Sequence, residues 1–174
     1  MRKLLPLLLL FILSACQSES RSPKDSQNPW KSVELITKSG DSIETTLSVT
    51  PTEQTQGLSG VKPEDYSDHD GMLFFYTMDG ERTFWMPDTY FDLDLFYLDK
   101  DMKVLDIVRK LQHYVGRTNP DLIPRARSVW ARHVLEMKSS SPVAAKIQIG
   151  DSLQWKSMYS LKETEAAAAK LLNQ

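Results

Sequence analysis

The segment of residues 71–99, GMLFFYTMDGERTFWMPDTYFDLDLFYLD, constrains the fold most, because it concentrates aromatic and long apolar side chains. Two apolar runs, Met72–Tyr76 and Phe84–Met86, flank a polar turn, and a third run follows at Leu93–Leu98. Short apolar runs separated by turn residues are typical of buried strands. The segment therefore predicts three strands that pack through one hydrophobic core.

Further strands are predicted on both sides of this segment. Apolar and polar residues alternate over residues 30–37 and 43–49 around a Ser-Gly-Asp turn, which predicts a hairpin. Apolar runs also predict a strand over residues 129–137 and a last strand near Trp155. Residues 102–108 do not alternate strictly, so a helix is the alternative there, but the compact polar turn before them favours a strand. We therefore expect an α+β fold that is mostly β, with a small barrel-like or strongly bent antiparallel or mixed sheet and two short helices.

The expected helices have recognisable start signals. Thr50 supplies an N-cap hydroxyl, proline follows at the first helical position, and Glu53 lies three residues after the cap, which predicts a capping box and a helix to Gln56. Ser141 is expected to cap a second short helix. The tail of residues 160–174 is rich in helix formers but short, so it predicts only a marginal helix.

The first residues predict export and attachment to a membrane. Residues 1–15 carry two basic residues, an apolar run and then small residues, the order of a secretory signal. The sequence Leu13-Ser14-Ala15-Cys16 resembles the lipobox of bacterial lipoproteins, whose cysteine carries the lipid. Cys16 is the only cysteine. A free thiol is a liability in an exported protein, so we expect lipidation of Cys16 in preference to a cleaved signal with an incidental thiol.

This interpretation gives the domain organisation and the location. Residues 1–15 are the predicted lipoprotein signal peptide, 16–29 a flexible polar tether, 30–159 a single globular domain and 160–174 the helical tail. The resemblance to lipoproteins implies a membrane partner through lipidated Cys16, on the periplasmic side. Gln17 after the cysteine favours the outer membrane of a Gram-negative bacterium.

The charge balance argues against nucleic acid as a partner. Without Arg2 and Lys3, the chain has 19 basic side chains against 23 acidic ones. Binding to a phosphate backbone depends on clustered basic residues, and here they are scattered apart from Arg125, Arg127 and Arg132.

Seven short motifs occur in a fixed order along the chain. They are Gln56-Gly57-Leu58, Gly71-Met72-Leu73-Phe74-Phe75, Phe84-Trp85-Met86, Asp88-Thr89, Leu93-Asp94-Leu95-Phe96-Tyr97-Leu98-Asp99, Val134-Leu135-Glu136 and Ile149-Gly150-Asp151. Together they resemble the signature of the domain of unknown function 192 family. The resemblance covers about residues 30–155. It implies a small, mostly β, barrel-like fold that is often exported, and it brings no established activity.

Three aspartates close in sequence form the first candidate site. Asp88, Asp92 and Asp94 lie within seven residues, and the last two would project from the same face of a strand. Paired carboxylates can act as acid and base or bind a hard cation. The structural alternative is that Asp88 caps a turn, Asp94 accepts backbone hydrogen bonds at a strand edge and Asp92 is solvated.

Aromatic residues beside these carboxylates predict a recognition surface, which we call the Trp85 to Asp94 face. Its candidate ligand-binding residues are Trp85, Asp88, Tyr90, Asp92 and Asp94. Rigid aromatic surface with nearby carboxylates commonly holds polar organic ligands. The same aromatic residues could instead belong to the core.

No cofactor or metal site is predicted. His69, His113 and His133 lack the spacing of metal ligands, and no fingerprint for a nucleotide or for a serine nucleophile occurs. We interpret Glu136 as one partner of a surface ion pair with Arg132, a contact that stabilises little.

Three functions stay open at this point. The first is a non-enzymatic, membrane-anchored periplasmic domain that binds a small ligand, glycan or peptide through the Trp85 to Asp94 face. The second is a hydrolase-type enzyme with Asp94 and either Asp88 or Glu136 as catalytic residues. The third is a structural or assembly partner of an envelope complex.

Overall fold

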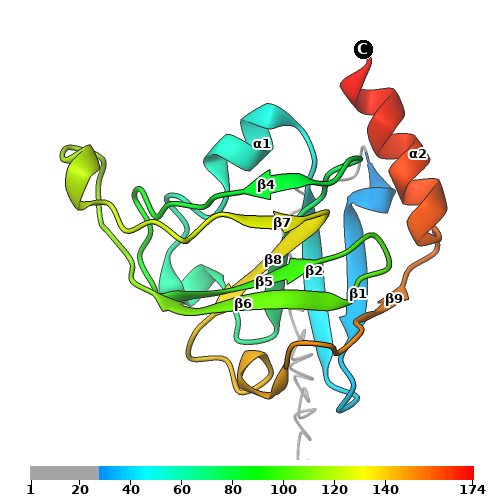
Figure 1. Ribbon diagram of the computed structural model, residues 1–174, viewed down its shortest axis with the longest axis horizontal. Coiled ribbons are helices and arrows are strands. Elements are labelled where there is room, and N and C mark those ends of the chain that lie inside the picture. Colours follow the sequence, from blue (N-terminus) through cyan, green and yellow to red (C-terminus); the bar gives the residue numbers. More distant parts are fainter. Residues whose placement is uncertain (1–27) are drawn as a thin grey trace, which may run out of the picture.

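A curled mixed sheet is the frame of the protein, seen in the computed structural model of Figure 1. The structure describes residues 28–174, so the predicted signal peptide, Cys16 and the tether up to residue 27 lie outside the described residues. Within that part, seven strands follow the order β6-β5-β8-β3-β2-β1-β9, and β4 and β7 form a separate two-stranded ribbon. The expected α+β, mostly β fold with a strongly bent mixed sheet is confirmed.

The elements have the following bounds. The strands are β1 (Ser32–Ile36), β2 (Ser42–Ser48), β3 (Asp70–Phe74), β4 (Gly80–Arg82), β5 (Leu93–Leu98), β6 (Val104–Leu111), β7 (Val129–Ala131), β8 (His133–Lys138) and β9 (Gln154–Lys156). The α-helices are α1 (Pro51–Gln56) and α2 (Leu161–Leu172). Short 3-10 turns lie at Pro29–Lys31, Pro63–Asp65, Pro120–Leu122 and Ala144–Lys146.

The start of the chain folds as its local signals predict. β1 and β2 form the expected antiparallel hairpin. The capping box of α1 is present, since the Thr50 hydroxyl accepts from the Glu53 N–H and the Glu53 carboxylate accepts from the Thr50 N–H. β2 then pairs in parallel with β3. Parallel neighbours need a crossover connection, and α1 lies in that crossover.

Two predicted strands are wrong in detail. The apolar run Phe84–Met86 is not a strand, and Trp85 makes only an isolated bridge with Arg125. Phe84 and Met86 are buried, so the run supplies core side chains. The strand predicted over residues 129–137 is interrupted at Arg132, because its first part leaves the main sheet to pair with β4 as β7.

Both faces of the central strands are covered. Alternation sends successive side chains of β3, β5 and β8 to opposite faces. One face joins a cluster that includes Leu35, Ile43, Leu73, Phe75, Phe96, Leu98, Leu135 and Met137. The other face joins Phe74, Leu95, Tyr97 and Val134 to Phe84, Met86, Ile123 and Ala126 from the segments that cross over it. Figure 1 shows α1 and the β4–β7 ribbon on the same side of the main sheet.

The two edge strands approach each other at one end of the curled sheet. The Val104 N–H donates to the Asp151 carbonyl at 2.8 Å, and the Leu153 N–H donates to the Met102 carbonyl at 3.0 Å. These bonds hold the end of β6 against the chain that enters β9. The sheet is therefore a half-barrel rather than an open layer.

The C-terminal tail is a packed helix. Ser160 and Glu163 form a second capping box, which sequence analysis did not use, and α2 buries Ala168 in the first cluster. Capping and burial stabilise a helix whose length alone is marginal. The second short helix expected after Ser141 is a 3-10 turn, although the Ser141 hydroxyl does accept from the Ala144 N–H. Among residues 28–174, neither helix has the length and apolar character needed to span a bilayer.

Candidate functional site

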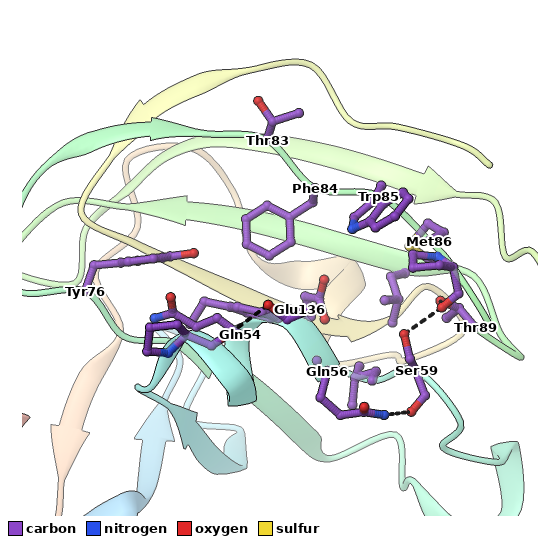
Figure 2. Close-up of a pocket in the computed structure, with 17 residues that line it drawn as sticks. Gln54, Gln56, Ser59, Tyr76, Thr83, Phe84, Trp85, Met86, Thr89 and Glu136 are labelled. Atoms are coloured by element: carbon purple, nitrogen blue, oxygen red, sulfur yellow. Dashed lines mark hydrogen bonds between the residues drawn. The ribbon is translucent and has the colours of Figure 1, made fainter. Parts of the chain in front are cut away.

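A pocket of about 430 Å³ lies on the second face of the sheet, between α1 and the segment of residues 83–89. Figure 2 shows aromatic side chains along its wall and the carboxyl group of Glu136 in its floor. The lining residues are Pro51, Gln54, Thr55, Gln56, Gly57, Leu58, Ser59, Phe74, Tyr76, Thr83, Phe84, Trp85, Met86, Pro87, Thr89, Leu93 and Glu136. Of the residues that the sequence nominated, Trp85 and Glu136 belong to this lining.

The two sides of the pocket are joined by hydrogen bonds. The Ser59 hydroxyl donates to the Pro87 carbonyl at 2.6 Å, and the Gly60 N–H donates to the Asp88 carbonyl at 2.8 Å. Gly57 makes this turn possible, because its φ is +47° and an added Cβ would lie 3.1 Å from the ring of Phe74. The end of α1 is thereby fixed against the opposite wall.

The aromatic wall is also held by packing. The rings of Phe84 and Phe74 meet edge to face with centroids 4.6 Å apart. Trp85 is 45% exposed, and the Arg125 guanidinium lies 5.1 Å from the centroid of its ring. Trp85 therefore borders the pocket at the surface, whereas Phe84 forms part of its interior.

Glu136 is the most unusual side chain of the pocket. It lies on β8 opposite Met72 and Leu95 and is only 4% exposed. Its carboxyl group has no hydrogen bond or ion pair with any described residue, and burial raises its pKa to about 8. The Tyr66 hydroxyl donates only to the backbone carbonyl of Glu136, at 3.3 Å. A buried titratable group without a partner, facing a cleft, is characteristic of functional sites.

The predicted surface ion pair between Glu136 and Arg132 is wrong. The Arg132 guanidinium pairs with Asp79 at 2.6 Å and with Glu165 at 3.2 Å. The sequence did carry a signal for the true position of Glu136. In the run Val134 to Met137, Glu136 is the one polar residue of a strand whose two faces are apolar, and such a strand is covered on both sides.

Asp94 has a structural environment. Its carboxylate accepts from Arg109 Nη1 at 2.6 Å, from the Lys110 N–H at 2.8 Å and from the Ser139 hydroxyl at 2.7 Å. Asp94 pairs with Met137 across the ladder, whereas Leu95 pairs with Glu136. Directly paired residues share a face, so Asp94 and Glu136 project from opposite faces of the sheet. The Asp94 and Glu136 carboxylates therefore do not meet in one catalytic site.

Asp88 and Asp92 contact different residues from each other and from Asp94. The Asp88 carboxylate accepts from the Tyr90 hydroxyl at 3.0 Å and from the Gly116 N–H at 3.3 Å. Asp92 pairs with His113 Nδ1 at 2.6 Å on the surface. Tyr90 is half-buried, with Lys62 Nζ 3.2 Å from its ring centroid. These residues lie beside the pocket and not in its lining, and residues 28–174 contain no group of three or more His, Cys, Asp or Glu placed to hold a metal.

Sequence analysis missed the contribution of α1 to the site. Gln54, Gln56 and Ser59 were interpreted only as parts of a helix and its end, and Tyr76 only as the end of a strand. Their convergence depends on the crossover between β2 and β3 passing over the second face. No local pattern in the chain records that path.

Comparisons with known proteins agree on the family and the fold. Residues 34–155 match the model of the family DUF192, described as "Uncharacterized ACR". A solved structure from Sinorhizobium meliloti 1021, described as a "putative transcription regulator", is 25% identical, has a TM-score of 0.55, and is matched over 71% of this chain and 92% of that chain. A protein of unknown function from Novosphingobium aromaticivorans DSM 12444 is 26% identical, with a TM-score of 0.56 over 71% of this chain and 84% of that chain. No curated protein matches.

Replacing Asp94 tests its structural role. Asp94→Asn removes a buried charge that three donors share, so we expect the free energy of unfolding to fall by about 2–3 kcal/mol in urea titrations. Asp92→Asn is the control, because it breaks an exposed pair and should cost less than about 1 kcal/mol. Equal losses in the two variants would show that Asp94 is not the structural residue described here.

Glu136 should make stability depend on pH. Its pKa is about 8 in the folded chain against an ordinary 4.5, so between these values the folded state holds a proton that the unfolded chain releases. The contribution of Glu136 to the free energy of unfolding should therefore fall by up to about 1.4 kcal/mol per pH unit across this window, and the difference between the wild type and a variant isolates it. Glu136→Gln cannot titrate, so its stability advantage over the wild type should grow from pH 5 to pH 8 in urea titrations. Parallel pH profiles would contradict the burial of an unpaired carboxyl group.

Proposed function

This chain belongs to the DUF192 family, and we propose that it is a binding domain for a small polar organic ligand, which occupies the pocket between α1 and residues 83–89. The proposal keeps Trp85 from the Trp85 to Asp94 face and adds Glu136 as the main polar contact. Asp88 then supports a wall of the site through the bond from the Gly60 N–H to its carbonyl, whereas Asp94 lies on the opposite face of the sheet, and neither touches the ligand.

The unpartnered carboxyl group of Glu136 carries this proposal. No described residue bonds to this carboxyl group, and Glu136 lines the pocket, so a bonding partner has to come from the pocket space. A ligand with a hydrogen-bond donor or a positive charge can supply that partner. The pocket volume of about 430 Å³ lies within the range of about 300–1,000 Å³ typical of small-molecule sites.

Binding is better supported than hydrolysis. A carboxyl group that acts as a general acid or base in hydrolysis works with a nucleophile, a second carboxylate or an oriented water. Among the described residues, no histidine, second carboxylate or hydroxyl is hydrogen-bonded to the Glu136 carboxyl group. The description of the Sinorhizobium meliloti protein as a regulator does not lead us to propose nucleic-acid binding, since acidic side chains outnumber basic ones in this chain.

The domain is proposed to work in the periplasm, held at the outer membrane by lipid on Cys16. The signal-like order of residues 1–15 and the lipobox support this location. Acyl chains contribute about 0.8 kcal/mol per buried methylene, so two or more chains hold a protein on a bilayer without an apolar surface patch. The polar residues 16–29 would then separate the binding domain from the membrane surface.

A ligand screen tests the pocket. We expect at least one compound from a set of sugars, short peptides and small polar organic molecules to raise the melting temperature of the purified protein. Trp85→Ala should weaken that compound about tenfold, because Trp85 borders the pocket, whereas Trp130→Ala should not change its affinity. Trp130 is a matched control, since it is 66% exposed and lies on β7. Equal effects of the two variants, or co-purification with an envelope protein and no small-molecule response, would contradict the proposal.

Cys16→Ser tests the anchor. The wild-type protein should incorporate labelled palmitate and sediment with the outer membrane, while the variant should take up no label and leave the membrane fraction. Sedimentation of Cys16→Ser with the membrane would show that attachment does not depend on this lipid.

A further inference from the structure

We propose that the pocket binds an organic cation, an ammonium or guanidinium group carried on an apolar body, with Glu136 as its counter-ion. This inference rests on the proposed function and names the class of ligand for the same pocket. It is carried by Glu136, the one acidic side chain in the described lining, whose carboxyl group has no partner there, and by the orientation of two glutamine amides in the same lining.

The two glutamines of α1 direct amide N–H groups to backbone carbonyls, and Gln56, with one such bond, keeps a second N–H. Gln54 Nε2 lies 3.2 Å from the Val49 carbonyl and 3.4 Å from the Phe75 carbonyl, and Gln56 Nε2 lies 2.6 Å from the Ser59 carbonyl. If either side-chain amide were turned by 180°, its Oε1 would lie against these backbone carbonyl oxygens, and two acceptors would face each other. Both side chains therefore keep an unoccupied Oε1, which can only accept.

Two hydroxyl groups of the lining are used in the same way, whereas those of Tyr76 and Thr83 have no partner among the described residues and can donate or accept. The Thr55 hydroxyl donates to the Pro51 carbonyl at 2.8 Å, and the Ser59 hydroxyl donates to the Pro87 carbonyl at 2.6 Å. A hydroxyl has one proton, so each of these groups keeps only lone pairs for a ligand. Figure 2 shows the bonds of Gln56 and Ser59 as dashed lines at the foot of the pocket. In this lining, Trp85 is the one side chain that can only donate.

Charge points the same way. Glu136 is the single acidic residue in the described lining of the pocket, which contains no lysine, arginine or histidine. An anionic ligand would meet this carboxyl group and several acceptor oxygens, whereas an ammonium or guanidinium group supplies donors to them. The guanidinium groups of Arg82 and Arg125 lie 3.5 and 5.1 Å from the ring centroids of Tyr76 and Trp85, and neither arginine belongs to the lining, so Glu136 is left as the partner for a cation inside the pocket. Phe84 supplies apolar surface for the rest of the ligand.

The surroundings of Glu136 make binding depend on pH. The titratable groups that interact with Glu136 are Tyr66, Tyr76 and Tyr97, from three separate segments of the chain. Burial raises the pKa of each tyrosine, so all three stay neutral. Without a ligand, the pKa of Glu136 is about 8. A bound cation favours the carboxylate, so its binding releases a proton from Glu136. Affinity for the cation should therefore rise by up to about tenfold per pH unit until the pH reaches about 8.

Three probes with one scaffold test the inference in titration calorimetry on the full-length protein. They are phenethylammonium, 2-phenylethanol and 3-phenylpropanoate, which present a cationic, a neutral and an anionic group beside the same ring. At pH 8 we expect the cation to bind at least about tenfold more tightly than the alcohol, with the anion weakest. Only the cation should gain affinity, by about tenfold, between pH 6 and pH 7. These comparisons use the unmodified protein and so do not depend on the folding of any variant.

Glu136→Gln then isolates the counter-ion. The variant should lose at least about tenfold in affinity for phenethylammonium and its pH dependence, while the affinity for 2-phenylethanol changes by less than about twofold. Tighter binding of the alcohol or the anion, or a cation affinity that Glu136→Gln leaves unchanged, would overturn the cation assignment while the pocket remains the binding site. Absence of binding by all three probes would also overturn the assignment. The proposed function is tested separately, by comparing Trp85→Ala with Trp130→Ala for the ligand found in the screen.

Discussion

The structure depends on a central sheet that must be covered on both faces. Strands β3, β5 and β8 alternate apolar side chains to two separate hydrophobic clusters, so no position on them faces water freely. This constraint explains why the chain wraps the half-barrel with α2 on one side and sends α1, the β4–β7 ribbon and the long connection over the other. It also means that each polar side chain on these strands lies in an apolar surrounding and needs a physical reason to be there.

Two carboxylates on neighbouring strands show the two possible outcomes. Asp94 on β5 faces the first cluster and is satisfied by three donors, among them Arg109, which also donates to the carbonyls of Ala144 and Ile147. Glu136 on β8 faces the second cluster and has no partner among the described residues. The first carboxylate stabilises the connections around it. The second lines the pocket, and so a ligand there can supply the partner that the protein does not.

The parts of the fold that the sequence predicts are those specified by signals within a few neighbouring residues. The hairpin, the capped helix α1 and the strand β5 follow from patterns contained within a few residues, and the sequence predicts them correctly. The ribbon of β4 and β7 has only three residues in each strand, and its pairing joins positions far apart in the chain. For the same reason, aspartates that are close in sequence have separate partners, while Gln56 and Glu136, 80 positions apart, line one pocket.

The sheet keeps a titratable group neutral on each of its faces. His133 is stacked on Phe75, its Nδ1 accepts from the Tyr76 N–H at 3.2 Å, and burial lowers its pKa to about 3. Between pH 4.5 and 6.5 the unfolded chain holds a proton on this histidine and none on Glu136, whereas the folded chain does the reverse. The two effects on stability therefore cancel in that range. Since His133 also fixes the backbone of Tyr76, whose side chain lines the pocket, the histidine helps to position the wall beside the carboxyl group. A cationic ligand would change only one member of this neutral pair, because Glu136 faces the pocket and His133 does not.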